Sequence, residues 1–134
     1  MMILIRYFIL LMFLVQISAS HPFYNKTTGG KELYAKHCLP CHQTDGSGVP
    51  GMFPPLVNTE KVIGQPDSLI RIVLFGLKGP TEVAGQIYTQ EMPAAGYLTD
   101  QEVAEILTWI RSSWGNKASA VTSKGVADMR KKGE

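Results

Sequence analysis

Potential metal-binding side chains are scarce in this sequence of 134 residues, which holds two cysteines and three histidines. A structural zinc site takes four Cys or His ligands, usually as two separated pairs, and no second cysteine pair exists here. A thioredoxin-like redox pair would need a βαβ setting, of which the sequence gives no sign. We therefore assign the two cysteines neither to a zinc site nor to a thioredoxin-like centre.

The sequence also lacks an excess of charge of one sign, internal repeats and the alternating pattern typical of strands. Its 13 basic and 11 acidic residues nearly balance, whereas a nucleic-acid-binding domain is expected to present a clustered basic face. The basic run at residues 130–132 is best explained as a solvated end. We expect no nucleic-acid partner.

Charge is almost absent from the N-terminus, where Arg6 is the single charged residue among the first 25. An apolar run at residues 7–17 and three small residues after it predict a signal peptide over residues 1–20. Export would place the remaining chain in the periplasm. The alternative is an uncleaved membrane anchor facing the periplasm, although the run is short for a span, which needs about 20 residues.

The two cysteines stand three apart and a histidine follows at once, in Cys38-Leu39-Pro40-Cys41-His42. This Cys-x-x-Cys-His pattern is typical of covalent haem attachment. Two thiols one helical turn apart can each bond one vinyl group on the same porphyrin edge, and His42 is then placed as the proximal ligand of the iron. A structural disulfide remains an alternative, but it gives no role to the histidine.

Helical periodicity predicts three helices joined by long loops, with a possible fourth helix in the tail. Two helices are expected over residues 31–39 and 66–77, and the first of them should end near Pro40. The third begins with a capping box at residues 99–102 and should continue its apolar face to Trp114, with Gly115 as its C-terminal cap.

The chain divides into the signal peptide, a leader over residues 21–28, one domain over residues 29–115 and a tail over residues 116–134. The tail is expected either to form a short helix near residues 126–132 or to be disordered.

Glycine and proline are concentrated in residues 44–56, which hold three of each. This composition predicts a long ordered loop. In a haem protein, such a loop can fix the proximal histidine by accepting a hydrogen bond from its outer ring nitrogen. We expect the carbonyl of Pro54 or Pro55 to have this role.

An iron held by one histidine has either a sixth ligand or an open face. No histidine follows His42, so the candidates for a sixth ligand are the methionines Met52, Met92 and Met129. Met92 lies in a loop of small residues with Pro93 after it, 50 residues beyond His42, so it can reach the other side of a porphyrin. Met52 is on the stretch expected to cover the proximal side, and Met129 is in the tail. We therefore expect Met92 to be the distal ligand.

The segment from about residue 30 to 115 resembles a class I cytochrome c domain. Gly30 and Tyr34 stand where that family places a glycine and an aromatic residue for the crossing of the C-terminal helix, and Trp109 matches the aromatic residue of that helix. Residues 92–102 are also similar to the haem domains of c-type subunits in membrane-bound dehydrogenases.

The resemblance implies an all-α fold of three to four helices and long loops around one covalent haem c. The haem would be attached through Cys38 and Cys41, with its iron between His42 and Met92. It also implies an electron-transfer protein, not an enzyme, that carries single electrons between redox partners such as a dehydrogenase, an oxidase or a reductase. The alternatives are a fixed electron-transfer subunit of an oxidoreductase complex and a haem enzyme or gas sensor in which Met92 is displaced.

Overall fold

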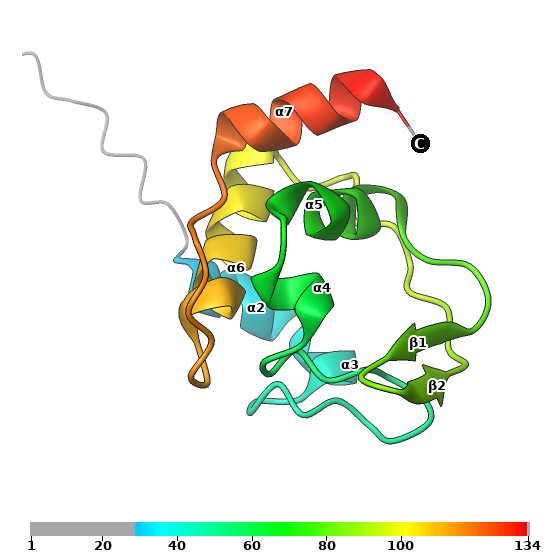
Figure 1. The fold of residues 1–134 in the computed structure, drawn as a ribbon. Helices are drawn as coiled ribbons and strands as arrows, with labels where there is room; N and C mark the ends of the chain where they lie inside the picture. The colour runs from blue at the N-terminus through cyan, green and yellow to red at the C-terminus, as the bar shows by residue number, and fades with distance from the viewer. Residues whose placement is uncertain (1–28, 134) are drawn as a thin grey trace, which may run out of the picture.

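The structure is a computed structural model that describes residues 29–133, and it is mainly helical (Figure 1). The predicted signal peptide and leader lie outside the described residues. The elements are α2 (Gly30–His37), α3 (Leu39–His42), α4 (Glu60–Ile63), α5 (Pro66–Phe75), β1 (Thr81–Val83), β2 (Gln86–Tyr88), α6 (Asp100–Ser112) and α7 (Ser123–Lys132). Within residues 29–133, no helix has the length and apolar character needed to cross a membrane.

The crossing of α2 and α6 organises the core, as the sequence predicted. Gly30 lets the two helices approach, because a Cβ at this position would lie only 2.7 Å from the Cβ of Trp109 and closer still to the carbonyl oxygen of Glu105. The Tyr34 ring packs against the Trp109 ring, with centroids 4.8 Å apart. The side chains of α5 and α6 complete this core.

The predicted capping box begins α6: the Thr99 side chain accepts a hydrogen bond from the backbone N–H of Glu102, whose side chain accepts one from Thr99. The expectation that Trp114 continues the helix is wrong. The helix ends at Ser112, and Trp114 and Gly115 both have positive φ. The Trp114 ring turns back onto Trp109, at a centroid distance of 4.9 Å.

The all-α fold class is confirmed, but the described residues hold six helices where three to four were expected. The first predicted helix ends at His37, and Pro40 lies in the first turn of the separate α3. The second ends at Phe75, two residues early, because Gly76 follows with a φ of +78°. The hairpin of β1 and β2 was not among the predicted elements.

The tail folds back over the core. Its α7 packs against α5 and α6, and its side chains Val126 and Met129 are buried. Near the end of α6, the buried Arg111 donates hydrogen bonds to the carbonyl oxygens of Val62, Gly64 and Ser119. The positive charge of the Arg111 guanidinium therefore lies at the C-terminal end of α4, where the free carbonyl groups are.

Candidate functional site

The predicted site residues come together at one apolar slot inside the helical shell. Cys38, His42 and Met92 all line it, and Cys41 lines an adjoining recess that shares His42 and Met92 with the slot. The empty space in the slot is about 630 Å³, part of it continuous with solvent. Its walls are aliphatic side chains of α4, α5 and α6: Val62, Leu69, Ile72, Val73, Ile106, Leu107 and Ile110.

His42 is held by the loop that follows it. Its Nδ1 lies 3.0 Å from the carbonyl oxygen of Pro54; because a carbonyl only accepts, Nδ1 donates and Nε2 is left as the ring nitrogen available to a metal. Burial lowers the pKa of His42, although the bond to Pro54 opposes that shift. The imidazole is thus kept neutral, the form that binds metals. Of the two carbonyls predicted from the sequence, Pro54 and Pro55, the structure has that of Pro54.

A glycine keeps this loop close to the histidine. Gly48 has a φ of +66°, and a Cβ there would lie 2.6 Å from the carbonyl oxygen of Pro54. The backbone N–H of Gly48 also donates to the carbonyl oxygen of His42, at 3.2 Å. The loop therefore returns to the residue from which it starts.

Cys38 and Cys41 are half-buried free thiols one turn apart, on either side of Pro40. Burial first, and then the neighbouring Cys41, raise the pKa of Cys38 to about 11. A reactive redox cysteine has a lowered thiol pKa, so this environment does not suit a thioredoxin-like nucleophile. Cys38 lines the apolar slot and Cys41 its recess, where a planar apolar group could lie against them.

Met92 enters the slot from a loop that is fixed to the end of α5. Its backbone N–H donates to the carbonyl oxygen of Leu77 at 3.0 Å, and the N–H of Leu77 donates back at 2.9 Å. Gly76 makes this pairing possible, because a Cβ there would lie 2.5 Å from the carbonyl oxygen of Met92.

The other two candidate methionines lie elsewhere. The Met52 side chain is exposed, and Met129 is buried in the core on α7. Neither lines the slot or its recess.

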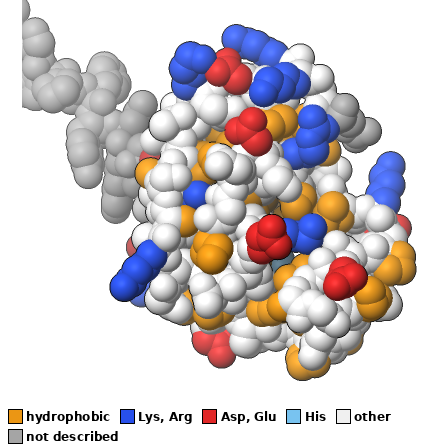
Figure 2. All heavy atoms as spheres, viewed as in Figure 1, with side chains coloured by type: hydrophobic (Ala, Val, Ile, Leu, Met, Phe, Trp, Pro, Cys, Tyr) orange, Lys and Arg blue, Asp and Glu red, His pale blue; other side chains and the backbone are white. Residues whose placement is uncertain are grey.

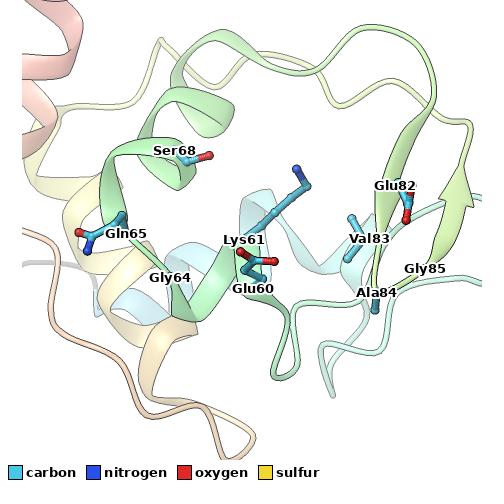
Figure 3. A pocket seen from close by; sticks show the side chains of 9 residues that line it. All are labelled: Glu60, Lys61, Gly64, Gln65, Ser68, Glu82, Val83, Ala84 and Gly85. Carbon is cyan, nitrogen blue, oxygen red and sulfur yellow. The ribbon is translucent and has the colours of Figure 1, made fainter.

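One ammonium group lies at the border of the slot. Lys61 of α4 lines both the slot and an open cleft between α4, the start of α5 and the hairpin. Its side chain extends into the space between α5 and β1 (Figure 3). On this face of the molecule, hydrophobic side chains lie in the hollow between α5 and the hairpin, with a few charged ones among them (Figure 2).

Comparison with known proteins agrees with this geometry. Residues 28–114 match the family model described as "Cytochrome c". The chain belongs to the cytochrome c family. As a monohaem class I member, it carries a covalently attached haem c, and the neutral histidine, paired thiols and apolar walls of the slot suit that group.

The relatives of this cytochrome include two proteins named as dehydrogenase subunits and one named only as a cytochrome. It is 44% identical over 106 residues to the gluconate 2-dehydrogenase cytochrome c subunit of Pantoea cypripedii, a match over 76% of this chain and 24% of that protein. It is 40% identical over 91 residues to cytochrome c-552 of Thermus thermophilus, over 65% of this chain and 69% of that protein.

A third relative is the cytochrome c subunit of the quinone-dependent alcohol dehydrogenase of Gluconobacter oxydans, 39% identical over 105 residues. The chain spans about a quarter of the length of these dehydrogenase subunits and about two thirds of cytochrome c-552.

Proposed function

We propose that this cytochrome passes single electrons between redox partner proteins through a haem held by Cys38, Cys41, His42 and Met92. The cysteines would form the thioether bonds, and His42 and Met92 would be the axial ligands. The observation that carries the proposal is the placement of His42 and Met92 on the walls of one slot, from segments 50 residues apart.

Haem c supplies an iron that alternates between the ferric and ferrous states, and a thioether ligand raises its reduction potential. The protein groups around the haem would keep its ligands in place and so maintain the reduction potential. Pro54 fixes the ring of His42, and the pairing with Leu77 fixes the backbone of Met92. With both axial positions filled, substrates and gases have no open position on the metal, so we assign no catalysis to this chain.

Two forms of the same function differ in how the protein is held. In the first, residues 1–20 are a cleaved signal peptide and the domain of residues 29–115, with its tail, is a periplasmic carrier. In the second, the chain is a fixed subunit of a dehydrogenase or oxidase complex, held by an uncleaved N-terminus or by docking. The name of cytochrome c-552 mentions no larger complex, which favours the first form. The longer relatives are named as dehydrogenase subunits, which favours the second.

Spectroscopy of the exported holoprotein tests the axial assignment and the cysteine bonds. The pyridine spectrum of reduced, denatured protein should report two thioether bonds, and a Cys38→Ser variant should report one. A redox titration should follow a single one-electron curve, and carbon monoxide should bind the reduced protein slowly. Rapid binding would contradict a filled sixth position and favour a haem enzyme or gas sensor.

Fractionation separates the two forms. A carrier should be released by osmotic shock as a monomer, with its N-terminus at or near residue 21. Recovery with the membrane fraction, as part of a larger assembly, would favour the fixed subunit.

A further inference from the structure

The loop that presents Met92 is held at several points. We define the Met92 loop as residues 92–98. Its first residue pairs with Leu77, and its middle is fixed by a hydrogen bond from the N–H of Ala95 to the carbonyl oxygen of Val73, at 2.8 Å. Both contacts come from α5 or the residues just after it. The backbone N–H groups of residues 96–98, at the end of the loop, donate no hydrogen bond to α5.

The far end of the loop is held by the buried side chain of Leu98 and, from the tail, by Arg130. The Arg130 guanidinium donates from Nη1 to the carbonyl oxygen of Gly96 at 2.7 Å and from Nη2 to that of Leu98 at 2.5 Å. Its Nε donates to Oδ1 of Asp100 at 2.8 Å, in the first turn of α6. One planar group therefore bonds the loop end and the helix that follows it.

The position of Arg130 depends on α7. The helix begins with a cap, in which the Thr122 hydroxyl accepts from the N–H of Gly125, at 3.1 Å. Its side chains Val126 and Met129 are buried against α5 and α6. The family match ends at residue 114, so the segment that supplies Arg130 lies beyond the matched haem domain.

Another side chain of the loop makes a polar contact on the opposite side. The Tyr97 hydroxyl lies 3.1 Å from Nδ1 of His37, but the Tyr97 side chain is 71% exposed. An exposed contact of this kind contributes little to fixing backbone. The carbonyl bonds from Arg130 are charge-assisted and only a third exposed at the arginine, so they are the stronger restraint.

We propose that Arg130 is a positioning residue for the axial methionine, acting from the tail to hold the Met92 loop against the slot. The inference rests on the proposed function, since it takes Met92 as the ligand. Any movement of the loop away from α5 that let Met92 leave the iron would be opposed by the bonds from Arg130 to Gly96 and Leu98. The tail thus lowers the population of the form in which the sixth position is open.

The test compares holoprotein variants Arg130→Ala and Arg130→Lys with Lys124→Ala as the matched control. Lys124 is a strongly exposed cation on the same helix, and its ion pair with Asp128 stays within α7. The measurements are the rate at which carbon monoxide binds the reduced protein and the hydrogen-exchange rate of the Ala95 and Leu98 amides. Arg130→Ala should increase each rate roughly tenfold, the effect of losing about one net charge-assisted hydrogen bond.

Arg130→Lys keeps the charge but has one nitrogen in place of a fork, so it should give a smaller increase of about threefold. Lys124→Ala should leave all rates unchanged. If Arg130→Ala does not accumulate as holoprotein, Arg130→Lys decides the question by itself. Rates equal to those of the parent protein in the arginine variants, or an equal increase in Lys124→Ala, would overturn the proposal.

A Met92→Ala variant separates this failure from failure of the proposed function. If Met92→Ala keeps the sulfur-to-iron charge-transfer band, the axial assignment is wrong, and the inference about Arg130 falls with it. If Met92→Ala loses the band and binds carbon monoxide rapidly while Arg130→Ala behaves as the parent, the axial assignment stands and only the inference about Arg130 is refuted.

Discussion

Gly76 lies between α5 and the Met92 loop, and replacing it tests how that loop is held. Its backbone has a φ of +78° and a ψ of −175°, a region that is nearly restricted to glycine and costs other residues about 1–3 kcal/mol. An added Cβ would also lie 2.5 Å from the carbonyl oxygen of Met92 and 2.9 Å from the backbone nitrogen of Ala94. Both are backbone atoms, so the loop itself must shift.

Gly79 offers a matched control three residues later. It also has a positive φ, of +74°, but a Cβ there would meet nothing within 4 Å. Gly79→Ala should therefore introduce only backbone strain, about 1–2 kcal/mol. Gly76→Ala should add the cost of steric overlap, typically about 1–3 kcal/mol, to its backbone cost of about 1–3 kcal/mol, for a total of roughly 2–6 kcal/mol in the free energy of unfolding.

Two measurements on the oxidised holoprotein distinguish these effects. Unfolding in guanidinium chloride gives the free energies, and the sulfur-to-iron charge-transfer band reports whether Met92 remains on the iron. Gly76→Ala should weaken or abolish the band, whereas Gly79→Ala should keep it at full intensity. A full band in Gly76→Ala, or an equal loss in both variants, would refute the claim that Gly76 sets the position of the Met92 loop.

Three further substitutions test other parts of the fold. Lys61→Gln should lower the reduction potential by roughly 20 mV in a redox titration. The reason is that a unit cation about 10 Å from the iron in water favours the reduced state by about 0.4 kcal/mol. A higher potential in the variant would contradict the placement of Lys61 at the border of the slot. Arg111→Met should destabilise the protein by about 3 kcal/mol in urea, because buried carbonyls lose their donor; a loss below about 1 kcal/mol would contradict that role. Hydrogen bonds from Thr99 lower the pKa of Glu102, so its stabilisation is present above the unfolded pKa and disappears as pH falls through the folded value. Glu102→Gln should thus be less stable than the parent by a few tenths of a kcal/mol at pH 7 and equal to it at about pH 3; a difference that persists in acid would exclude the carboxylate as its source.

The features predicted from the sequence are those that short-range chemistry specifies. The capping box of α6 depends on two side chains three residues apart, and both hydrogen bonds form. The loop after His42 was predicted from its content of glycine and proline, and the contact of His42 with Pro54 forms within that loop. The crossing at Gly30 is a long-range contact and was predicted only from the family resemblance. The structure gives its reason, since a Cβ at Gly30 would overlap the backbone of α6.

The features that were missed depend on tertiary contacts or on unusual turn residues. The hairpin turns at Ala84 and Gly85, which both have positive φ. Such turns favour Asn-Gly or Asp-Gly, so alanine conceals the signal. Arg130 is in a basic run that looks like a solvated end, and nothing local indicates that three acceptors from residues 96–100 surround it. The bonds of Arg111 to α4 likewise cannot be predicted from local sequence, because they join segments that are nearly 50 residues apart.

Absorption of the oxidised holoprotein in Met92→Ala and Met52→Ala variants tests the central claim most directly. Met92 lines the slot and Met52 is exposed outside it, so the sulfur-to-iron charge-transfer band should vanish in Met92→Ala and persist in Met52→Ala, with haem still covalently attached in both. A band that survives in Met92→Ala, or one that is lost in Met52→Ala, would contradict the axial pair of His42 and Met92.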